Sequence, residues 1–327
     1  MHRASNRPSL HTVLFTRHSA NPILTAADWP YPAHSVFNAG ACQIGDETIL
    51  LARVEDRRGH SHLTVARSND GVSNWQIDTS PSFAPDLELH SEEEWGVEDP
   101  RLTWMEERQE WIIAYTAYSP SGPLVALART KDFTSFSRLG PVMPPEDKDA
   151  AVFPRRFGGR YAMIHRPVSS GSSGAHIWIS FSPDLIHWGD HQVLLHARQG
   201  AWWDANKIGL SPPPLETPEG WLILYHGVRH TASGSIYRLG LALLDLEDPR
   251  RVIRRSDEWI FAPEMPYECH GDVGYVVFPC GWILDKATGV IRIYYGGADS
   301  CLALATAQVS ELLNYLKKCP GPVNMTR

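Results

Sequence analysis

Short runs in which apolar and polar residues alternate, separated by clusters of turn-forming residues, fill most of this chain. Such alternation is typical of β-strands with one buried face, and most of the runs carry β-branched or aromatic residues at every second place. A helical period is visible only near the end, in SELLNYLKK. The pattern predicts an all-β protein. The clearest runs read ETILLARV, HLTVARS, EWIIAYTAY, PLVALART, RYAMIHRP, HIWISFS, GWLILYHGV, YRLGLALLDL and VIRIYYGG.

One phrase recurs five times: a strand, a small polar turn, then an aromatic or aliphatic residue that opens another strand. Its copies lie roughly 50 to 60 residues apart, the scale of a propeller blade with loop insertions. A single blade cannot bury both of its faces, so blades pack around a common axis. The copies are VARSNDGVSNWQI at 65–77, LARTKDFTSFSRL at 127–139, ISFSPDLIHWGDHQVL at 179–194, ALLDLEDPRRVI at 242–253 and the degenerate ALATAQVSELLNYL at 303–316.

Five copies predict one five-bladed β-propeller domain over residues 1–327, with its active site in a central axial pocket. We expect a short N-terminal arm at about 1–20 and a C-terminal helix at about 309–318. Trp75 and Trp188 each close one of the repeated turns. We interpret both as structural residues that cap a blade edge.

Composition and charge narrow the class of protein. Hydrophobic residues make up 43% of the chain and charged residues 20%, which is a globular composition. The formal net charge of -7 argues against a nucleic-acid partner, since such proteins concentrate basic residues on one surface. No apolar run has the length of a signal peptide or of a membrane helix. We therefore expect a soluble, cytoplasmic protein with no membrane partner, whose five cysteines stay reduced.

The segment WGVEDPRL at 95–102 places Glu98 and Asp99 directly before a proline. Proline holds the preceding residue extended, so we expect Asp99 to be fixed at a strand entrance. A carboxyl enclosed there by Trp95 and loops would have the raised pKa of a general acid. The alternative is a turn carboxylate bonded to nearby backbone amides. Neighbouring side chains of an extended segment point opposite ways, so one of the two carboxylates should be structural.

Six cationic residues lie in segments otherwise rich in apolar and small residues, where solvated surface cations are rare. Converging cations of this kind suit inorganic phosphate or a sugar phosphate. Salt bridges to Asp147, Asp149 and Asp204 are the alternative. The six are Lys148, Arg155, Arg156, Arg166, Lys207 and His226.

Aromatic residues near these polar groups indicate a carbohydrate site, because sugar rings stack their C–H faces on aromatic planes. They are Trp202, Trp203, Tyr237, Tyr267 and Tyr295. The sequence lacks the motifs of dinucleotide, P-loop, zinc-protease and hydrolase-elbow chemistry. His60 and His62 are two residues apart with no third ligand nearby, so no metal is expected.

An ordered set of motifs runs from about residue 20 to 312 and resembles the β-mannoside phosphorylases of glycoside hydrolase family 130. The resemblance implies a five-bladed propeller and an inverting reaction, in which inorganic phosphate, as a co-substrate, attacks a β-mannoside and releases α-mannose 1-phosphate. It implies no cofactor. The motifs are NPIL, SVFNAGA, ARVEDRRG, SHLTVARSNDG, WGVEDPRL, VFPRR, HRP, NKIG, GWLILYHGV, YECHGDVGYVVFPCG and YYGGAD.

The resemblance also assigns site residues. The catalytic acid matches Asp99, whose proton is passed through a hydroxyl of the bound mannose. Some relatives have arginine in place of Lys148, and lysine binds phosphate as a point charge rather than a fork. The phosphate-binding positions match Lys148, Arg166, Lys207, His226 and Tyr237. The expected substrate-binding residues are Asn38, Arg53, Glu268, Asp272 and Asp299.

Two other functions stay open at this point. Hydrolases of the family lack the phosphate cations and use a carboxylate to activate water, for which Glu268 is the candidate here. An inverting hydrolase needs its two carboxyls roughly 6.5 to 9.5 Å apart. A non-catalytic carbohydrate-binding propeller would have no use for a buried acid opposite clustered cations.

The linkage and the assembly are expectations from resemblance alone. The segment EDRRGHSHL resembles relatives that act on β-1,2-linked mannosides more than those that act on β-1,4-linked ones. We therefore expect β-1,2-mannobiose or oligomannan as the substrate. Because the family commonly assembles, a homo-oligomer is also expected.

Overall fold

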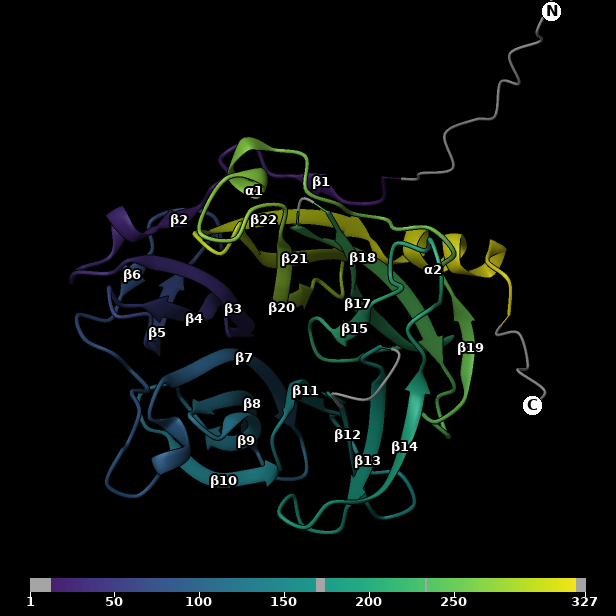
Figure 1. Ribbon diagram of the computed structural model, residues 1–327, viewed down its shortest axis with the longest axis horizontal. Coiled ribbons are helices and arrows are strands. Elements are labelled where there is room, and N and C mark those ends of the chain that lie inside the picture. The colour runs from purple at the N-terminus through teal and green to yellow at the C-terminus, as the bar shows by residue number, and fades with distance from the viewer. Residues whose placement is uncertain (1–12, 169–173, 233, 322–327) are drawn as a thin grey trace, which may run out of the picture.

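The computed structural model describes residues 13–168, 174–232 and 234–321, and most of its regular structure is β-strand (Figure 1). The all-β prediction is confirmed. Hydrogen bonds join the strands into sheets of eight, five, five and four strands. Inside the eight-stranded sheet, one parallel bridge from Ser61 to Gly96 connects two antiparallel groups. The described chain therefore contains five antiparallel groups in sequence order.

The first two groups form the eight-stranded sheet. Gly45, at a φ of 59°, makes the tight turn between the first two strands, a backbone conformation that favours glycine. The first group comprises β3 (Ser35–Ile44), β4 (Glu47–Glu55), β5 (Ser61–Ser68) and β6 (Gln76–Ile77). The second comprises β7 (Gly96–Met105), β8 (Glu110–Ser119), β9 (Gly122–Thr130) and β10 (Ser137–Met143).

The other three groups are separate sheets. The third comprises β11 (Asp147–Val152), β12 (Tyr161–Pro167), β13 (Ile177–Ser182) and β14 (Gly189–Leu195). The fourth comprises β15 (Lys207–Leu210), β16 (Leu215–Thr217), β17 (Gly220–Thr231), β18 (Gly234–Leu244) and β19 (Val252–Arg255). The fifth comprises β20 (Val277–Leu284), β21 (Val290–Gly297) and β22 (Cys301–Gln308), with β1 (Thr16–Arg17) and β2 (Leu24–Thr25) paired to β22.

Few of the described residues are helical. Helix α2 follows β22 directly and buries Leu312, Leu313 and Leu316 against the fourth and fifth groups. This is the predicted C-terminal helix, with the predicted bounds. No described helix is long and apolar enough to cross a membrane. The helical segments are η1 (Ala26–Asp28), η2 (Ser91–Glu93), α1 (Pro266–Cys269) and α2 (Val309–Lys318).

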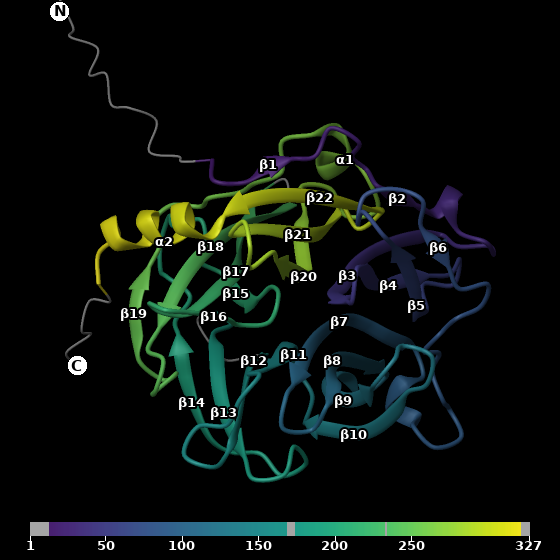
Figure 2. The ribbon, with the colours of Figure 1, turned by 180° about the vertical axis from the view of Figure 1, so that it is seen from behind.

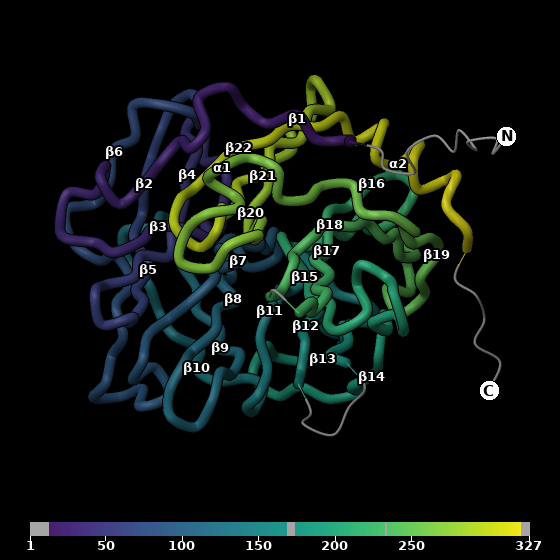
Figure 3. The backbone as a smooth tube through the Cα atoms, turned by 45° about the horizontal axis from the view of Figure 1, so that its top comes forward, coloured from purple at the N-terminus to yellow at the C-terminus, as the bar shows by residue number. Residues whose placement is uncertain are grey.

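The five groups follow one another around the molecule, and the first strand of each lies toward the middle (Figures 1 and 2). β3 contacts β7 and β20, while β11 contacts β7 and β15. Figure 3 shows α1 and the loop around it above β20. This arrangement brings the polar ends of the first strands together from distant parts of the sequence.

Apolar packing links each group to the next. One buried cluster joins groups one and two, another two and three, another three and four, and another four and five. A further cluster joins the fifth group back to the first, with Tyr294 and Leu302 packed near Leu50 and Val36. Among the described residues, no strand pairing joins the fifth group to the first, and these two groups meet through hydrophobic packing.

The first four copies of the repeated phrase each span the step to the outermost strand of one group, from β5 to β6, β9 to β10, β13 to β14 and β18 to β19. The fifth copy runs from β22 into α2, and β1 and β2 pair with β22 in the place of an outer strand. Trp75 and Trp188 are partly buried, and their indole N–H groups donate to the carbonyl oxygens of Val72 and Leu185 within their own turns. These contacts agree with the structural interpretation of both tryptophans.

Candidate active site

The same backbone irregularity brings a polar side chain inward from three of the first strands. β3, β7 and β11 each shift register, and Asn38, Asp99 and Asp149 within the shifts have φ values of 47°, 52° and 56°. Asn and Asp are the non-glycine residues that best tolerate this conformation, and a bulge changes the direction of the side chain. Asp299, with a φ of 50°, follows β21 and is partly buried.

These residues line a central cavity of about 130 Å³. The cavity contains nine of the predicted site residues: Asn38, Arg53, Asp99, Lys148, Arg166, Lys207, His226, Tyr237 and Asp299. The rest of its lining is Asp149, Val273, Val276 and Phe278, which sequence reasoning did not assign to the site.

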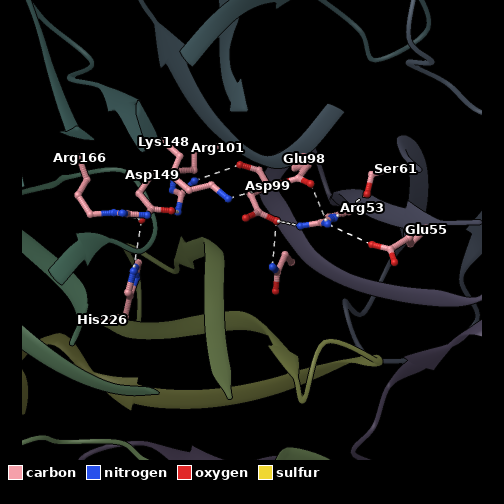
Figure 4. A network of polar contacts seen from close by, with 11 residues as sticks. Arg53, Glu55, Ser61, Glu98, Asp99, Arg101, Lys148, Asp149, Arg166 and His226 are labelled. Carbon is pink, nitrogen blue, oxygen red and sulfur yellow. Dashed lines mark hydrogen bonds and ion pairs between the residues drawn. The ribbon is translucent and has the colours of Figure 1, made fainter. Parts of the chain in front are cut away.

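One side of the cavity is organised around Asp99 (Figure 4). Its Oδ1 accepts hydrogen bonds from Asn38 Nδ2 at 2.9 Å and from Arg53 Nη1 at 3.1 Å. Arg53 Nη2 also donates to Glu98 Oε1 at 3.0 Å and to Glu55 Oε2 at 3.1 Å. Arg53 thus holds three carboxylates, with Asp99 at the cavity and the other two behind it.

The prediction that Glu98 and Asp99 point opposite ways is wrong, because both carboxylates reach Arg53. The cause is the bulge between Glu98 and Arg101, which breaks the alternation of side chains that an extended strand would give. Glu98 also lies 3.4 Å from Lys148 Nζ, so it connects the two sides of the site.

The expected raised pKa of Asp99 is also not found. Burial alone would raise the pKa of this carboxyl, but Arg53, Lys148 and Arg101 and the hydrogen bond from Asn38 outweigh burial and lower it. Asp99 is therefore ionised at neutral pH. Ligands that engage these cations weaken their hold on the carboxylate and raise its pKa.

The carboxyl with a raised pKa is Asp299. Burial raises its pKa to about 7, against the attraction of Arg53, and the negative charge of Asp99 adds to the effect. The cavity therefore contains two interacting carboxyls in different protonation states near neutral pH. Two neighbouring carboxyls with different pKa values are typical of sites that transfer a proton.

The other side of the cavity is cationic. Arg166 Nε lies 2.8 Å from Asp149 Oδ2, and His226 Nε2 lies 3.4 Å from the same oxygen. Burial would raise the pKa of Asp149, but Arg166 and His226 lower it well below its ordinary value. Asp149 is the fixed anion that orients these two side chains, and Figure 4 shows both of them reaching it.

Lys207 forms no ion pair with any carboxylate of the described residues. Its Nζ lies 5.4 Å from the ring centroid of Tyr237. Burial, together with the positive charge of Arg166, lowers the pKa of Lys207 to about 8. An anion bound among Lys148, Arg166 and Lys207 would relieve the repulsion between them.

Arg101 is a site residue that sequence reasoning missed. It is 1% exposed and donates to the backbone oxygens of Asp99, Leu210 and Ser211, with a further contact of 3.4 Å to Asp149 Oδ1. Its guanidinium therefore links the Asp99 side of the cavity to the Asp149 side. Its position two residues after Asp99, in the motif WGVEDPRL, was the sequence feature that could have identified it.

Gly209, in the motif NKIG, was also missed. A Cβ atom at this position would overlap the carboxylate of Asp149 and the ring of His226. The absence of a side chain allows β15 to lie directly against this pair of polar groups.

Glu268 and Asp272 do not line the cavity. Glu268 is fully buried and accepts hydrogen bonds from Arg17, from the hydroxyl of Tyr295, and from two backbone N–H groups. A carboxylate with all of these partners is a structural anchor, which argues against its role as a water-activating base. Asp272 lies at the surface, 2.8 Å from His34.

Several other expected contributors also lie elsewhere. Arg155 pairs with Glu247 and Glu216, and Arg156 pairs with Glu107. Among the expected aromatic residues, only Tyr237 lines the central cavity, with Trp202 and Trp203 beside a different cavity and Tyr267 and Tyr295 near Glu268. Sequence proximity to polar groups did not predict the direction of these side chains.

A metal site would require a cluster of ligands. Within residues 13–168, 174–232 and 234–321, no group of three or more His, Cys, Asp or Glu side chains is arranged to hold a metal ion. The charges of the site are instead those of arginine, lysine and carboxylate side chains.

Comparison with known proteins identifies relatives across almost the whole chain. The sequence model of a family described as β-1,4-mannooligosaccharide phosphorylase matches residues 14–318. A β-1,4-mannooligosaccharide phosphorylase of Ruminococcus albus is 35% identical over 308 residues, covering 92% of this chain and 90% of the relative. A β-1,2-mannobiose phosphorylase of Listeria innocua is 38% identical over 257 residues, covering 79% of this chain and 69% of the relative.

A solved structure is similar in fold. The complex of a Listeria innocua β-1,2-mannobiose phosphorylase with β-1,2-mannobiose matches with a TM-score of 0.84 and 30% identity. The match covers 93% of this chain and 99% of that one.

Proposed function

Because the chain belongs to glycoside hydrolase family 130, the family of mannoside phosphorylases, we propose that its central cavity carries out the inverting phosphorolysis of a β-mannoside. The observation that carries the proposal is the single cavity that joins a carboxylate side, around Asp99, to a cationic side with Lys148, Arg166 and Lys207. The cavity therefore offers a positively charged place for phosphate directly beside a carboxylate-lined place for a sugar.

The sugar is proposed to bind on the carboxylate side. Asn38, Arg53 and Asp299 offer hydrogen-bond donors and acceptors at short range, as the hydroxyls of mannose require. Asn38 Oδ1 is buried and has no hydrogen-bond partner in the described structure, so a sugar hydroxyl would supply the missing donor.

Phosphate is proposed to bind on the cationic side, held by Lys148, Arg166 and Lys207 with His226 and Tyr237. An oxygen of phosphate forms a bond to the anomeric carbon as the glycosidic bond breaks, and the configuration inverts. Asp99 supplies the proton that the leaving oxygen takes up, through a hydroxyl of the bound mannose as the family resemblance implies. Phosphate contributes the nucleophile, so only one protein carboxyl acid is needed.

Hydrolysis is not favoured. Glu268, the candidate base, does not line the cavity and is committed to Arg17 and Tyr295. The cations that a phosphorylase needs are present and face the same space as Asp99.

We propose β-1,2-mannobiose or oligomannan as the substrate and α-mannose 1-phosphate as the product. The support is the EDRRGHSHL segment and the likeness to the Listeria innocua protein. The test is to compare kcat/KM for β-1,2- and β-1,4-mannobiose with phosphate, with NMR to identify the anomer of the first-formed product. Faster phosphorolysis of the β-1,4 isomer would overturn the linkage, and a β anomer would overturn inversion.

The five strand groups are proposed to be the blades of a five-bladed propeller. The support is the continuous apolar packing from the fifth group back to the first and the pairing of β1 and β2 with β22. We also propose a cytoplasmic enzyme, supported by five cysteines that are all free thiols. A homo-oligomer is proposed from the family resemblance, and light scattering of the purified protein tests it.

A further inference from the structure

A second cavity, which the proposed reaction does not use, lies beside an exposed tryptophan. This Trp202 cavity has a volume of about 400 Å³ and is lined by Ala201, Trp202, Trp203, Arg229, Arg238, Glu258 and Trp259. Trp202 is 41% exposed, and the guanidinium of Arg198 lies 4.4 Å from the centroid of its ring.

The Trp202 cavity lies on the opposite face of the β17–β18 hairpin from the central cavity. Arg238 follows Tyr237 on β18, and successive strand residues face opposite ways. Arg238 pairs in register with Gly227, where a Cβ atom would overlap Trp203. The hairpin thus presents Tyr237 to the central cavity and Arg238 to the second one.

Two guanidinium groups, Arg229 and Arg238, line this cavity with one carboxylate, Glu258, so positive charges outnumber negative ones. Arg229 lies two residues beyond Gly227 on β17, so it is a diagonal neighbour of Arg238. Neither arginine forms an ion pair with a carboxylate of the described residues. Burial and the charge of Arg229 lower the pKa of Arg238. Repulsion of this kind is relieved when an anion binds between the two groups.

The remaining lining matches a sugar. The exposed indole of Trp202 provides a flat apolar surface for the C–H face of a hexose, although Arg198 already lies over this ring, and Glu258 provides an acceptor for hydroxyl groups. The guanidinium forks of Arg229 and Arg238 match the geometry of a phosphate group.

We propose that the Trp202 cavity is a second ligand site, separate from the central cavity, and that it binds a hexose phosphate. The phosphate lies between Arg229 and Arg238, the sugar ring lies against Trp202, and Glu258 accepts a hydrogen bond from a hydroxyl. The enzyme would then bind this class of molecule at two places in each chain.

The test is calorimetric titration of the full chain with α-mannose 1-phosphate, which is expected to show two sites per chain. The double variant R229Q/R238Q should lose one of them, with affinity reduced about 100-fold through the loss of two charge-assisted contacts. Its phosphorolysis parameters should not change, because neither arginine lines the central cavity. R251Q is the matched control, since Arg251 is exposed and directly precedes β19 of the same strand group.

Other outcomes would overturn the proposal. One site in the native protein, or two unaltered sites in R229Q/R238Q, contradicts it. Equal binding of mannobiose at this cavity would show that the arginines do not recognise phosphate. If W202A changes the oligomeric state and leaves binding intact, the surface is a contact between copies instead. Binding is measured without turnover, so two sites in a protein that fails to phosphorolyse mannosides would refute only the proposed reaction.

Discussion

At the scale of single residues, Asp99 depends on its neighbours for its role. Its carboxyl is kept ionised by the charges of Arg53, Lys148 and Arg101 and by the hydrogen bond from Asn38. A general acid must hold a proton when the substrate is bound, so ligand binding has to raise the pKa of Asp99. A phosphate anion among the cations and a sugar that excludes water both act in that direction.

Replacement of Asp99 by Asn is expected to lower kcat by about 10³-fold, because an amide cannot supply the proton. Mannoside binding should persist, since Asn keeps the acceptor oxygen for Asn38 and Arg53. Steady-state kinetics and calorimetry of the same preparation measure the two effects. Unchanged turnover would show that the acid is another residue.

Asp299 gives a prediction about stability. Its pKa of about 7 in the folded protein is above the ordinary 3.8, so the folded state loses stability relative to the unfolded state as the pH rises between these values. D299N has no such charge to bury. The melting temperature of D299N relative to the native protein should therefore be higher at pH 8 than at pH 5. A difference that is the same at both pH values would contradict the raised pKa.

Lys207 predicts how phosphate binding depends on pH. Its pKa of about 8 means that its positive charge is lost as the pH rises through this value. The KM for phosphate should therefore rise between pH 7.5 and 9.5, whereas the KM for the mannoside should change less. K207R keeps its charge over this range and should show a flatter profile. A rise of the same steepness in K207R would assign the titration to another group.

The sequence predicted most of the polar residues of the cavity but not how they interact. Nine residues expected on the basis of resemblance line it. The direction of Glu98 was predicted wrongly, and Arg101 was missed, because the alternation of side chains fails at a bulge. Asp99 within this bulge has a positive φ that the sequence does not display. Glu268 was misassigned because its partner Arg17 is 251 residues away in sequence.

At the scale of elements, the close approach of β15 to β11 depends on Gly209. Replacement by Ala should displace Asp149 or His226, because a Cβ atom overlaps both. Since these groups orient Arg166, we expect G209A to raise the KM for phosphate at least about 10-fold, the loss of one charge-assisted hydrogen bond. Circular dichroism checks that the fold is retained. A folded G209A with an unchanged phosphate KM would show that the pair is not needed for phosphate.

A partly buried ion pair between Arg17 and Glu268 attaches β1 to α1. R17A leaves the Glu268 charge without its main partner, and we expect a loss of about 3 kcal/mol in unfolding free energy. Phosphorolysis by the folded fraction should be unaffected. Denaturant titration measures the unfolding free energy, and steady-state kinetics measure phosphorolysis. A stable R17A with altered product distribution would point back to a chemical role for Glu268.

The repeated phrase predicted the last two strands of the first four groups well, because a polar turn between alternating runs is a local signal. It did not reveal that, in the last group, β22 is followed by α2 and that β1 and β2, from the other end of the chain, pair with β22 as its outer strands. Such pairings join distant residues and leave no local signature.

At the scale of the whole molecule, the all-β architecture could be predicted because alternation recurs along the chain. The sheet boundaries could not, since one bridge between Ser61 and Gly96 merges two groups into one sheet. The ring-like packing follows from each group burying both faces against its neighbours. It places the bulged first strands of several groups around one cavity, which is why residues as distant as Asn38 and Asp299 act together.

The measurement that tests this account most directly is the phosphate dependence of mannobiose cleavage. The purified enzyme is incubated with β-1,2-mannobiose with and without inorganic phosphate, and mannose 1-phosphate and free mannose are quantified separately. We predict cleavage only with phosphate, with one mannose 1-phosphate for each mannose released. Equal cleavage without phosphate, giving free mannose alone, would contradict phosphorolysis and show that water is the nucleophile.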